Sequence, residues 1–79
     1  MQKMIIAVKL NERKENSAKF QEVISNYGDI IKFRVGISGE EQKGLIMLCA
    51  EAENKVINNL TDDLKLINEL SMNIMEAPV

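Results

Sequence analysis

The chain has no histidine, no tryptophan and a single cysteine, Cys49. Transition-metal sites need several well-placed nitrogen or sulfur donors, so we expect no nickel or zinc site and no bound cofactor. A lone cysteine forms no internal disulfide, which is compatible with a reducing compartment. Beside Met47 and Leu48 on a strand, Cys49 is expected to pack as a small apolar side chain, since a nucleophilic thiolate needs a nearby base or positive field.

Neither sign of charge dominates, and the apolar runs are short. Lysine and arginine number 10 against 12 aspartates and glutamates, a net charge of −2, and the two signs are interleaved. Nucleic-acid backbones attract concentrated positive charge, so direct DNA or RNA binding is not expected. The first apolar run is broken by Lys9 and is too short for a membrane span or a secretory signal, which predicts a cytoplasmic protein.

Length and composition indicate one globular domain over residues 1–79, with 46% hydrophobic and 28% charged residues. Domains of this size bury only about 60–65% of the surface of the unfolded chain. Oligomerisation is a common way for such small domains to bury more. The small size of the chain therefore favours association.

Period-two and period-3.6 apolar patterns alternate along the chain. The first helix carries Phe20, Val23, Ile24 and Tyr27 on one stripe, and we predict that Gly28 ends it as a C′ residue. The second helix carries a stripe from Val56 to Ile67. Strands are predicted at 3–10, 30–37, 43–51 and 70–75, with a hairpin connection at 38–42.

The order strand, helix, strand, strand, helix, strand predicts an α+β, ferredoxin-like βαββαβ sandwich. In this topology both helices cover one face of a four-stranded antiparallel sheet. The first and third strands are central, which suits segments that are apolar on both faces, and the second and fourth are edges. On the second strand one face should carry Ile31, Phe33, Val35 and Ile37, and the other Lys32 and Arg34. Lys32 and Arg34, together with Asn73 of the fourth strand, should point to solvent.

Several segments resemble the family of iron-only hydrogenase system regulators. They are 5–10, 27–36, 45–50 and the helix beginning near Asn54, and the sharpest element is Asp29-Ile30 followed by Arg34-Val35-Gly36. The resemblance implies an ACT-like fold, similar also to the carboxy-terminal half of the nickel-responsive repressor. Such units pair and bind small effectors or metal between subunits. This chain departs from the repressor in lacking histidine and a ribbon-helix-helix arm, so nickel and operator binding are not expected.

No catalytic group is predicted, and we expect the protein not to be an enzyme. Glu40-Glu41 and Asp62-Asp63 are adjacent pairs whose side chains point apart, so neither forms a carboxylate dyad. The five methionines are spread over several segments and suit adaptable packing better than a soft-metal site.

Arg34, Val35 and Gly36 form the candidate ligand-binding site. Arginine offers a fork of donors to a carboxylate or phosphate, and glycine allows close backbone approach, so a small anionic effector is the ligand that such a site would hold. The reading that we favour is simpler: an edge-strand arginine in a surface ion pair, followed by a glycine that the turn requires.

Apolar residues on both faces of the central strands predict at least a homodimer. Half of the side chains on each central strand must point away from the helices. On the third strand these are either Leu45, Met47 and Cys49 or Ile46, Leu48 and Ala50. The interface residues chosen are Ile5, Ala7, Ile46 and Leu48. Two functions follow: a regulatory module that self-associates and binds a small effector, or an interaction domain that docks another protein through its sheet without a ligand.

Overall fold

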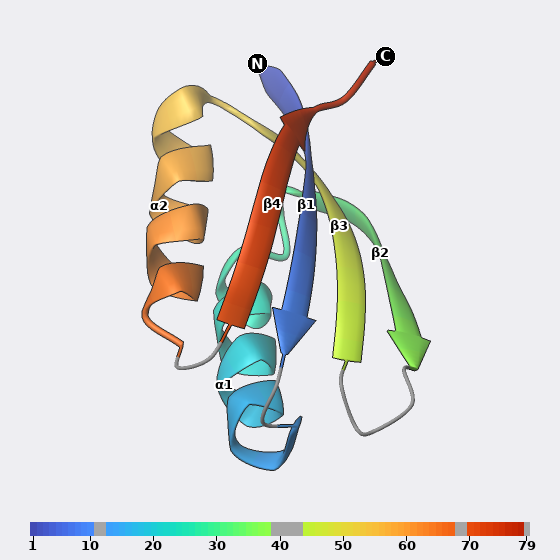
Figure 1. Ribbon diagram of the computed structural model, residues 1–79. Helices are drawn as coiled ribbons and strands as arrows, with labels where there is room; N and C mark the ends of the chain where they lie inside the picture. The colour runs from blue at the N-terminus through green and yellow to red at the C-terminus, as the bar shows by residue number, and fades with distance from the viewer. Residues whose placement is uncertain (11–12, 39–43, 68–69, 79) are drawn as a thin grey trace.

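The computed structural model describes residues 1–10, 13–38, 44–67 and 70–78 (Figure 1). Its elements follow the predicted order: β1 (Gln2–Leu10), α1 (Arg13–Asn26), β2 (Ile31–Ser38), β3 (Gly44–Ala52), α2 (Asn54–Lys65) and β4 (Leu70–Glu76). The predicted hairpin connection falls almost entirely outside the described residues. No helix among those described is long and apolar enough to cross a membrane.

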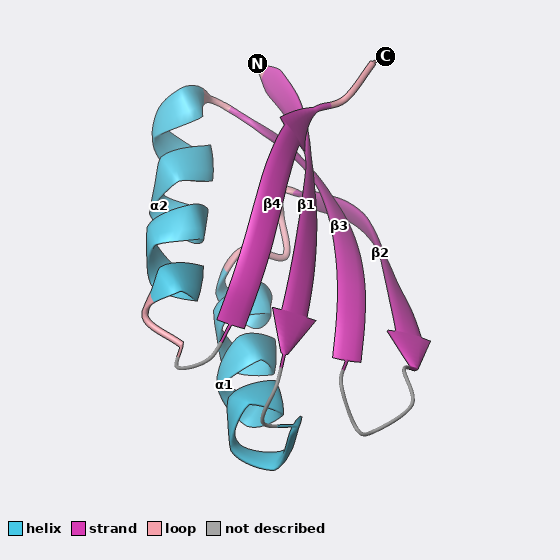
Figure 2. Cartoon of the chain, viewed as in Figure 1, coloured by secondary structure: helices cyan, strands magenta, loops and turns pink. Residues whose placement is uncertain are grey.

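The four strands form one sheet in the order β2-β3-β1-β4, with every neighbouring pair antiparallel. Figure 2 shows both helices on the same side of this sheet. The predicted ferredoxin-like fold is thus confirmed, with β1 and β3 in the centre and β2 and β4 at the edges. Among the described residues, no helix covers the other broad face of the sheet.

The core lies between the helices and one face of the sheet. Alternation along β1 turns Ile6 and Val8 toward the helices, and the register sets Ile6 opposite Leu48. Helix α2 contributes Ile57, Leu60 and Leu64, whose spacing of three and four residues places them on one helical face. Burying a side chain such as Leu60 contributes about 1.5–3 kcal/mol. Among the described residues, the buried apolar cluster is Ile6, Val8, Leu10, Phe20, Ile24, Leu48, Ala50, Ala52, Ile57, Leu60, Leu64 and Ile67.

Helix α1 ends at Asn26, so Gly28 follows its end closely, as predicted, but without the left-handed geometry that is usual for a C′ residue. Gly28 does not adopt a left-handed backbone, and a Cβ there would lie 3.7 Å from the carbonyl oxygen of Ser25, an ordinary contact. Turn hydrogen bonds to the Tyr27 carbonyl close the segment instead, from the amides of Ile30 at 3.1 Å and Ile31 at 3.3 Å. The glycine therefore marks a turn without being demanded by its backbone conformation.

Strand β2 also departs from the expected alternation. The pairing with β3 shifts between Ile31 and Phe33: Ile31 lies opposite Ala50, and Phe33 lies opposite Cys49. A shift of this kind moves the residues after it to the other face. Ile31 therefore lies on the helix-covered face together with Arg34, while Phe33 and Val35 point to the uncovered face, so the predicted grouping of Ile31 with Phe33 is wrong.

Candidate functional site

The helix-free side of the sheet, here called the open face, is the most distinctive surface of the described chain. Directly paired residues in antiparallel strands point to the same side, so the register defines this face. Its described side chains are Lys3, Ile5, Ala7 and Lys9 of β1, Phe33 and Val35 of β2, Leu45, Met47, Cys49 and Glu51 of β3, and Ser71, Asn73 and Met75 of β4.

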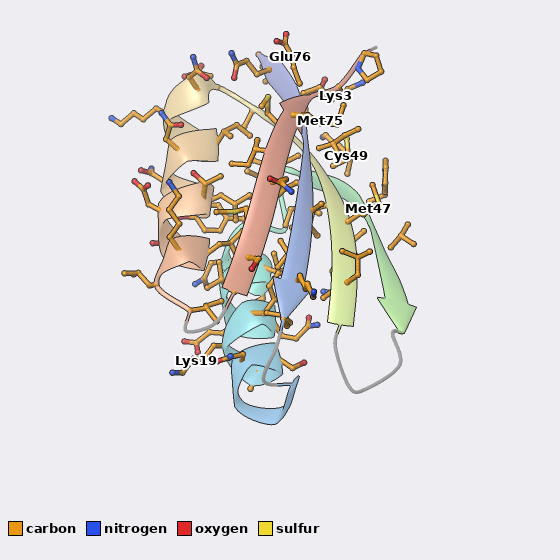
Figure 3. The ribbon with its side chains drawn as sticks, in the orientation of Figure 1. Lys3, Lys19, Met47, Cys49, Met75 and Glu76 are labelled. Atoms are coloured by element: carbon orange, nitrogen blue, oxygen red, sulfur yellow. The ribbon has the colours of Figure 1, made fainter. Side chains whose placement is uncertain are left out.

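Large apolar side chains on the open face remain in contact with solvent. Phe33 is 54% exposed, Val35 49%, Leu45 38%, Met47 36% and Met75 56%. Figure 3 shows Met47 and Cys49 on the side of the sheet away from α2. Scattered exposed apolar residues are common on soluble proteins, whereas several on one sheet face make that face a candidate interaction surface.

Ile5 and Ala7 lie on the open face, but the choice of Ile46 and Leu48 as interface residues is wrong. Ile46 pairs with Val8 and Leu48 with Ile6, which places both on the helix-covered face. Leu48 has 0% exposure, so it belongs to this chain's own core and has no surface to offer a partner. On β3 the open positions are the alternative set, Leu45, Met47 and Cys49. Sequence alternation left both sets open, and pairing with β1 decided between them.

Arg34, Val35 and Gly36 do not converge on one point. The Nη1 of Arg34 donates a hydrogen bond to Oε1 of Gln21 on α1 at 2.7 Å, on the helix side of the sheet edge. Val35 points to the open face. A Cβ built on Gly36 would have nothing within 4 Å, so the space beside this glycine is open. The arginine is thus engaged by an intramolecular partner, and the predicted anion site remains a prediction.

A pocket of about 460 Å³ lies on the open face and draws its lining from β1, β2, β3 and the segment after β4. We call it the open-face pocket; it is lined by Lys3, Ile5, Lys32, Phe33, Cys49, Glu51, Ala77 and Pro78. The register explains its assembly, since Ile5 and Phe33 flank Cys49 from opposite sides. Cys49 is only 5% exposed, in keeping with the packing role expected for it.

Charge in this pocket comes from three side chains. Nζ of Lys3 lies 3.9 Å from Oε2 of Glu51, a partly exposed ion pair across β1 and β3. Lys32 lies at the register shift of β2 and has no ion-pair partner among the residues that the structure describes. Sequence reasoning missed this site. Opposite charges at Lys3 and Glu51 signal a cross-strand pair only after the register is known.

A second hollow of about 370 Å³ lies between the helices and is lined by Lys19, Glu22, Val23, Asn26, Asp63, Leu66 and Ile67. Beside it, the hydroxyl of Tyr27 donates to Oδ2 of Asp63 at 2.6 Å. This hydrogen bond to the carboxylate raises the pKa of Tyr27 above 10.0, with smaller effects from desolvation and from the charges of Asp63 and Asp62. The described residues include no group of three or more histidine, cysteine, aspartate or glutamate side chains suited to a metal ion.

Comparison with solved structures shows how widely this fold recurs. A Thermotoga maritima protein, TM1266, superposes with a TM-score of 0.88 at 21% identity over 95% of each chain. An ACT domain protein from Streptococcus pneumoniae gives a TM-score of 0.64 at 16% identity, over 96% of this chain and 90% of that one. The C-terminal domain of the Mycobacterium tuberculosis MgtC protein gives 0.65 at 11% identity, over 98% and 88%. At these identities the likeness concerns the fold.

Comparison with curated proteins found no match. The sequence profile of the TM1266-like family, described as "Iron-only hydrogenase system regulator, putative", matches residues 2–73. The match covers all six elements except the last residues of β4. Sequence profile and fold agree, and the resemblance seen in the sequence is confirmed: this chain belongs to the TM1266-like family.

Proposed function

We propose that this protein is a non-catalytic regulatory module that self-associates through its open face and binds a small effector at or near the subunit interface. The family description supports a role linked to the iron-only hydrogenase system. The shared fold with an ACT domain protein supports a regulatory module. The observation that carries self-association is the group of exposed apolar side chains on a sheet whose opposite face is already covered.

The dimensions of the open face suit a modest interface. Strands lie about 4.8 Å apart and rise about 3.3 Å per residue, so a sheet of this size has a face of roughly 500 Å² before side-chain relief is added. Two such faces in contact bury about 1,000 Å² or more, near the lower end of specific protein–protein interfaces. We therefore expect an association that depends visibly on protein concentration.

The distribution of polar and apolar side chains indicates which half of the open face should form the contact between subunits. Phe33, Val35, Leu45 and Met47 belong to β2 and β3, whereas Ser71 and Asn73 of β4 are polar. Apolar residues at the centre and polar residues at the rim are the usual anatomy of an interface. The contact is therefore expected to centre on the β2–β3 half of the open face.

Substitution of Met47 by glutamate tests the proposal. A buried, unpaired carboxylate is strongly unfavourable, so Met47→Glu is expected to shift the protein to monomer in light scattering over a concentration series. Leu66→Glu is the matched control, because Leu66 is 80% exposed and lies outside the open face. It should leave the assembly unchanged, and circular dichroism checks the fold of both variants.

A wild-type protein that stays monomeric at high micromolar concentration would contradict self-association. The open face would then serve the alternative function, docking of a different protein without a small-molecule ligand. That outcome leaves effector binding to be judged separately, by ligand titration.

A further inference from the structure

We infer that the open-face pocket binds small organic monoanions that carry an apolar, preferably aromatic, body and a single carboxylate. The inference rests on the proposed function in one respect, since it names the class and the site of the effector. It moves that site away from Arg34, which is hydrogen-bonded to Gln21. The pocket joins an apolar floor to Lys32, whose positive charge has no ion-pair partner within the described part of the chain.

The apolar part of the pocket is provided by three neighbouring strands. Ile5 of β1 and Phe33 of β2 flank Cys49 of β3, so their side chains form a continuous surface across the sheet. Phe33 remains 54% exposed, which leaves a ring face for stacking. A volume of about 460 Å³ lies within the range of small-molecule sites, which are mostly apolar with a few placed polar groups.

The charges of the lining select a monoanion. Lys3 and Glu51 compensate each other at 3.9 Å, and Lys32 contributes one further positive charge. A carboxylate near Lys32 completes the charge balance, whereas the ammonium group of an amino acid would have to compete with Lys3 for Glu51. A neutral amide of the same shape would keep the apolar contacts and lose the ionic one. The expected order of affinity is therefore carboxylate above amino acid and amide.

The test uses 3-phenylpropionate as the probe, titrated into the full chain labelled with nitrogen-15. Amide signals of Ile5, Phe33 and Cys49 should shift with saturation. The neutral 3-phenylpropanamide and the zwitterion phenylalanine should bind with an affinity at least about tenfold lower, because each lacks the net negative charge. Acetate, which has the charge without the apolar body, should produce no saturable shift of these signals.

Lys32→Gln is expected to weaken 3-phenylpropionate binding about tenfold. Lys9→Gln is the matched control, because Lys9 lies on the same face of β1 at the far end from Lys3, about 20 Å along the strand. The inference would be overturned by any of three results: equal affinity for 3-phenylpropionate and its amide, an equal loss of affinity in the two lysine variants, or shifts of amide signals outside the pocket.

Light scattering on the same samples separates this inference from self-association. If the protein is a monomer and binds the probe in the pocket, the pocket inference is supported and self-association is contradicted. If it forms a concentration-dependent dimer and the pocket signals do not respond to the probe, self-association is supported and the pocket inference is contradicted.

Discussion

Tyr27 and Asp63 connect the end of α1 to α2 through a single side-chain hydrogen bond of 2.6 Å. The donor must keep its proton to make this bond, because a phenolate beside a carboxylate is repelled. The pKa of Tyr27 is accordingly raised above 10.0, first by the hydrogen bond from its hydroxyl to Asp63. A raised pKa in the folded state means that the folded protein holds this proton more firmly than the unfolded chain does.

The contribution of this bond to stability is therefore expected to depend on alkaline pH. It should be complete below the ordinary value of 10.0 and lost as pH rises through the raised pKa of the folded state. Tyr27→Phe lacks the titrating hydroxyl, so the wild type should be the more stable protein at neutral pH and the difference should shrink above pH 10. Urea unfolding of both proteins from pH 8 to about pH 11 measures it.

All groups other than the Tyr27 hydroxyl are common to both proteins, so their contributions cancel in the difference. A difference in unfolding free energy that stays constant across the alkaline range would show that Tyr27 stabilises by packing alone.

At the level of elements, β2 is shaped by the shift between Ile31 and Phe33. A register shift there lets Ile31 pack against the core while Phe33 and Val35 turn outward. Without it, Phe33 would share the helix side with Ile31 and the open-face pocket would lose its aromatic wall. The irregularity in this edge strand thus adds Phe33 and Val35 to the exposed apolar group and gives the pocket its aromatic wall.

Gly36 follows this shift in β2 with open space around its Cα hydrogens. A Cβ there would have nothing within 4 Å, and its φ lies outside the left-handed region. Gly36→Ala is therefore expected to raise the free energy of unfolding by about 0.5–1 kcal/mol, because alanine restricts the unfolded chain more than glycine. Urea denaturation checks the value. Gly28→Ala, in the turn after α1, should change it by less than about 1 kcal/mol.

A clear loss of stability in Gly36→Ala would mean that the strand needs glycine for a close approach that this structure does not contain. A large loss in Gly28→Ala would mean that the turn after α1 requires the backbone freedom of glycine.

For the molecule as a whole, the described fold has one core and one uncovered sheet face. Its Cα radius of gyration, 11.9 Å, is close to the value of about 11.6 Å expected for a compact chain of this length. The exposed apolar residues of the open face therefore do not arise from loose folding. They lie outside a core that the chain completes by itself, which is why substitutions in the core and on the open face should have different consequences.

Leu60→Ala should destabilise the fold by about 2–5 kcal/mol, because Leu60 is fully buried between α2 and the sheet and its loss leaves a cavity. Leu66→Ala, the same change at an exposed position, should stay within about 0.5 kcal/mol of the wild type. Chemical unfolding at fixed protein concentration compares them. Similar losses in both variants would mean that Leu66 is buried in solution, for example against another subunit.

The order of the elements, the central place of β1 and β3, and the family were all readable from the sequence. Alternation of side chains and the helical stripe of Ile57, Leu60 and Leu64 are local patterns, imposed by the geometry of a strand or helix whatever lies around it. Membership in the TM1266-like family followed from the same kind of information, since the matching segments are continuous stretches of chain.

Tertiary pairing decided which of two apolar sets faces outward. A register change of one residue exchanges the faces of a strand, so the choice between Leu48 and Met47 depended on where β3 meets β1. Strand pairing likewise turned Arg34 toward Gln21 and brought Lys3 of β1 into one pocket with Lys32 and Phe33 of β2. Contacts between residues far apart in the chain set these features, and neither periodicity nor composition carries that information.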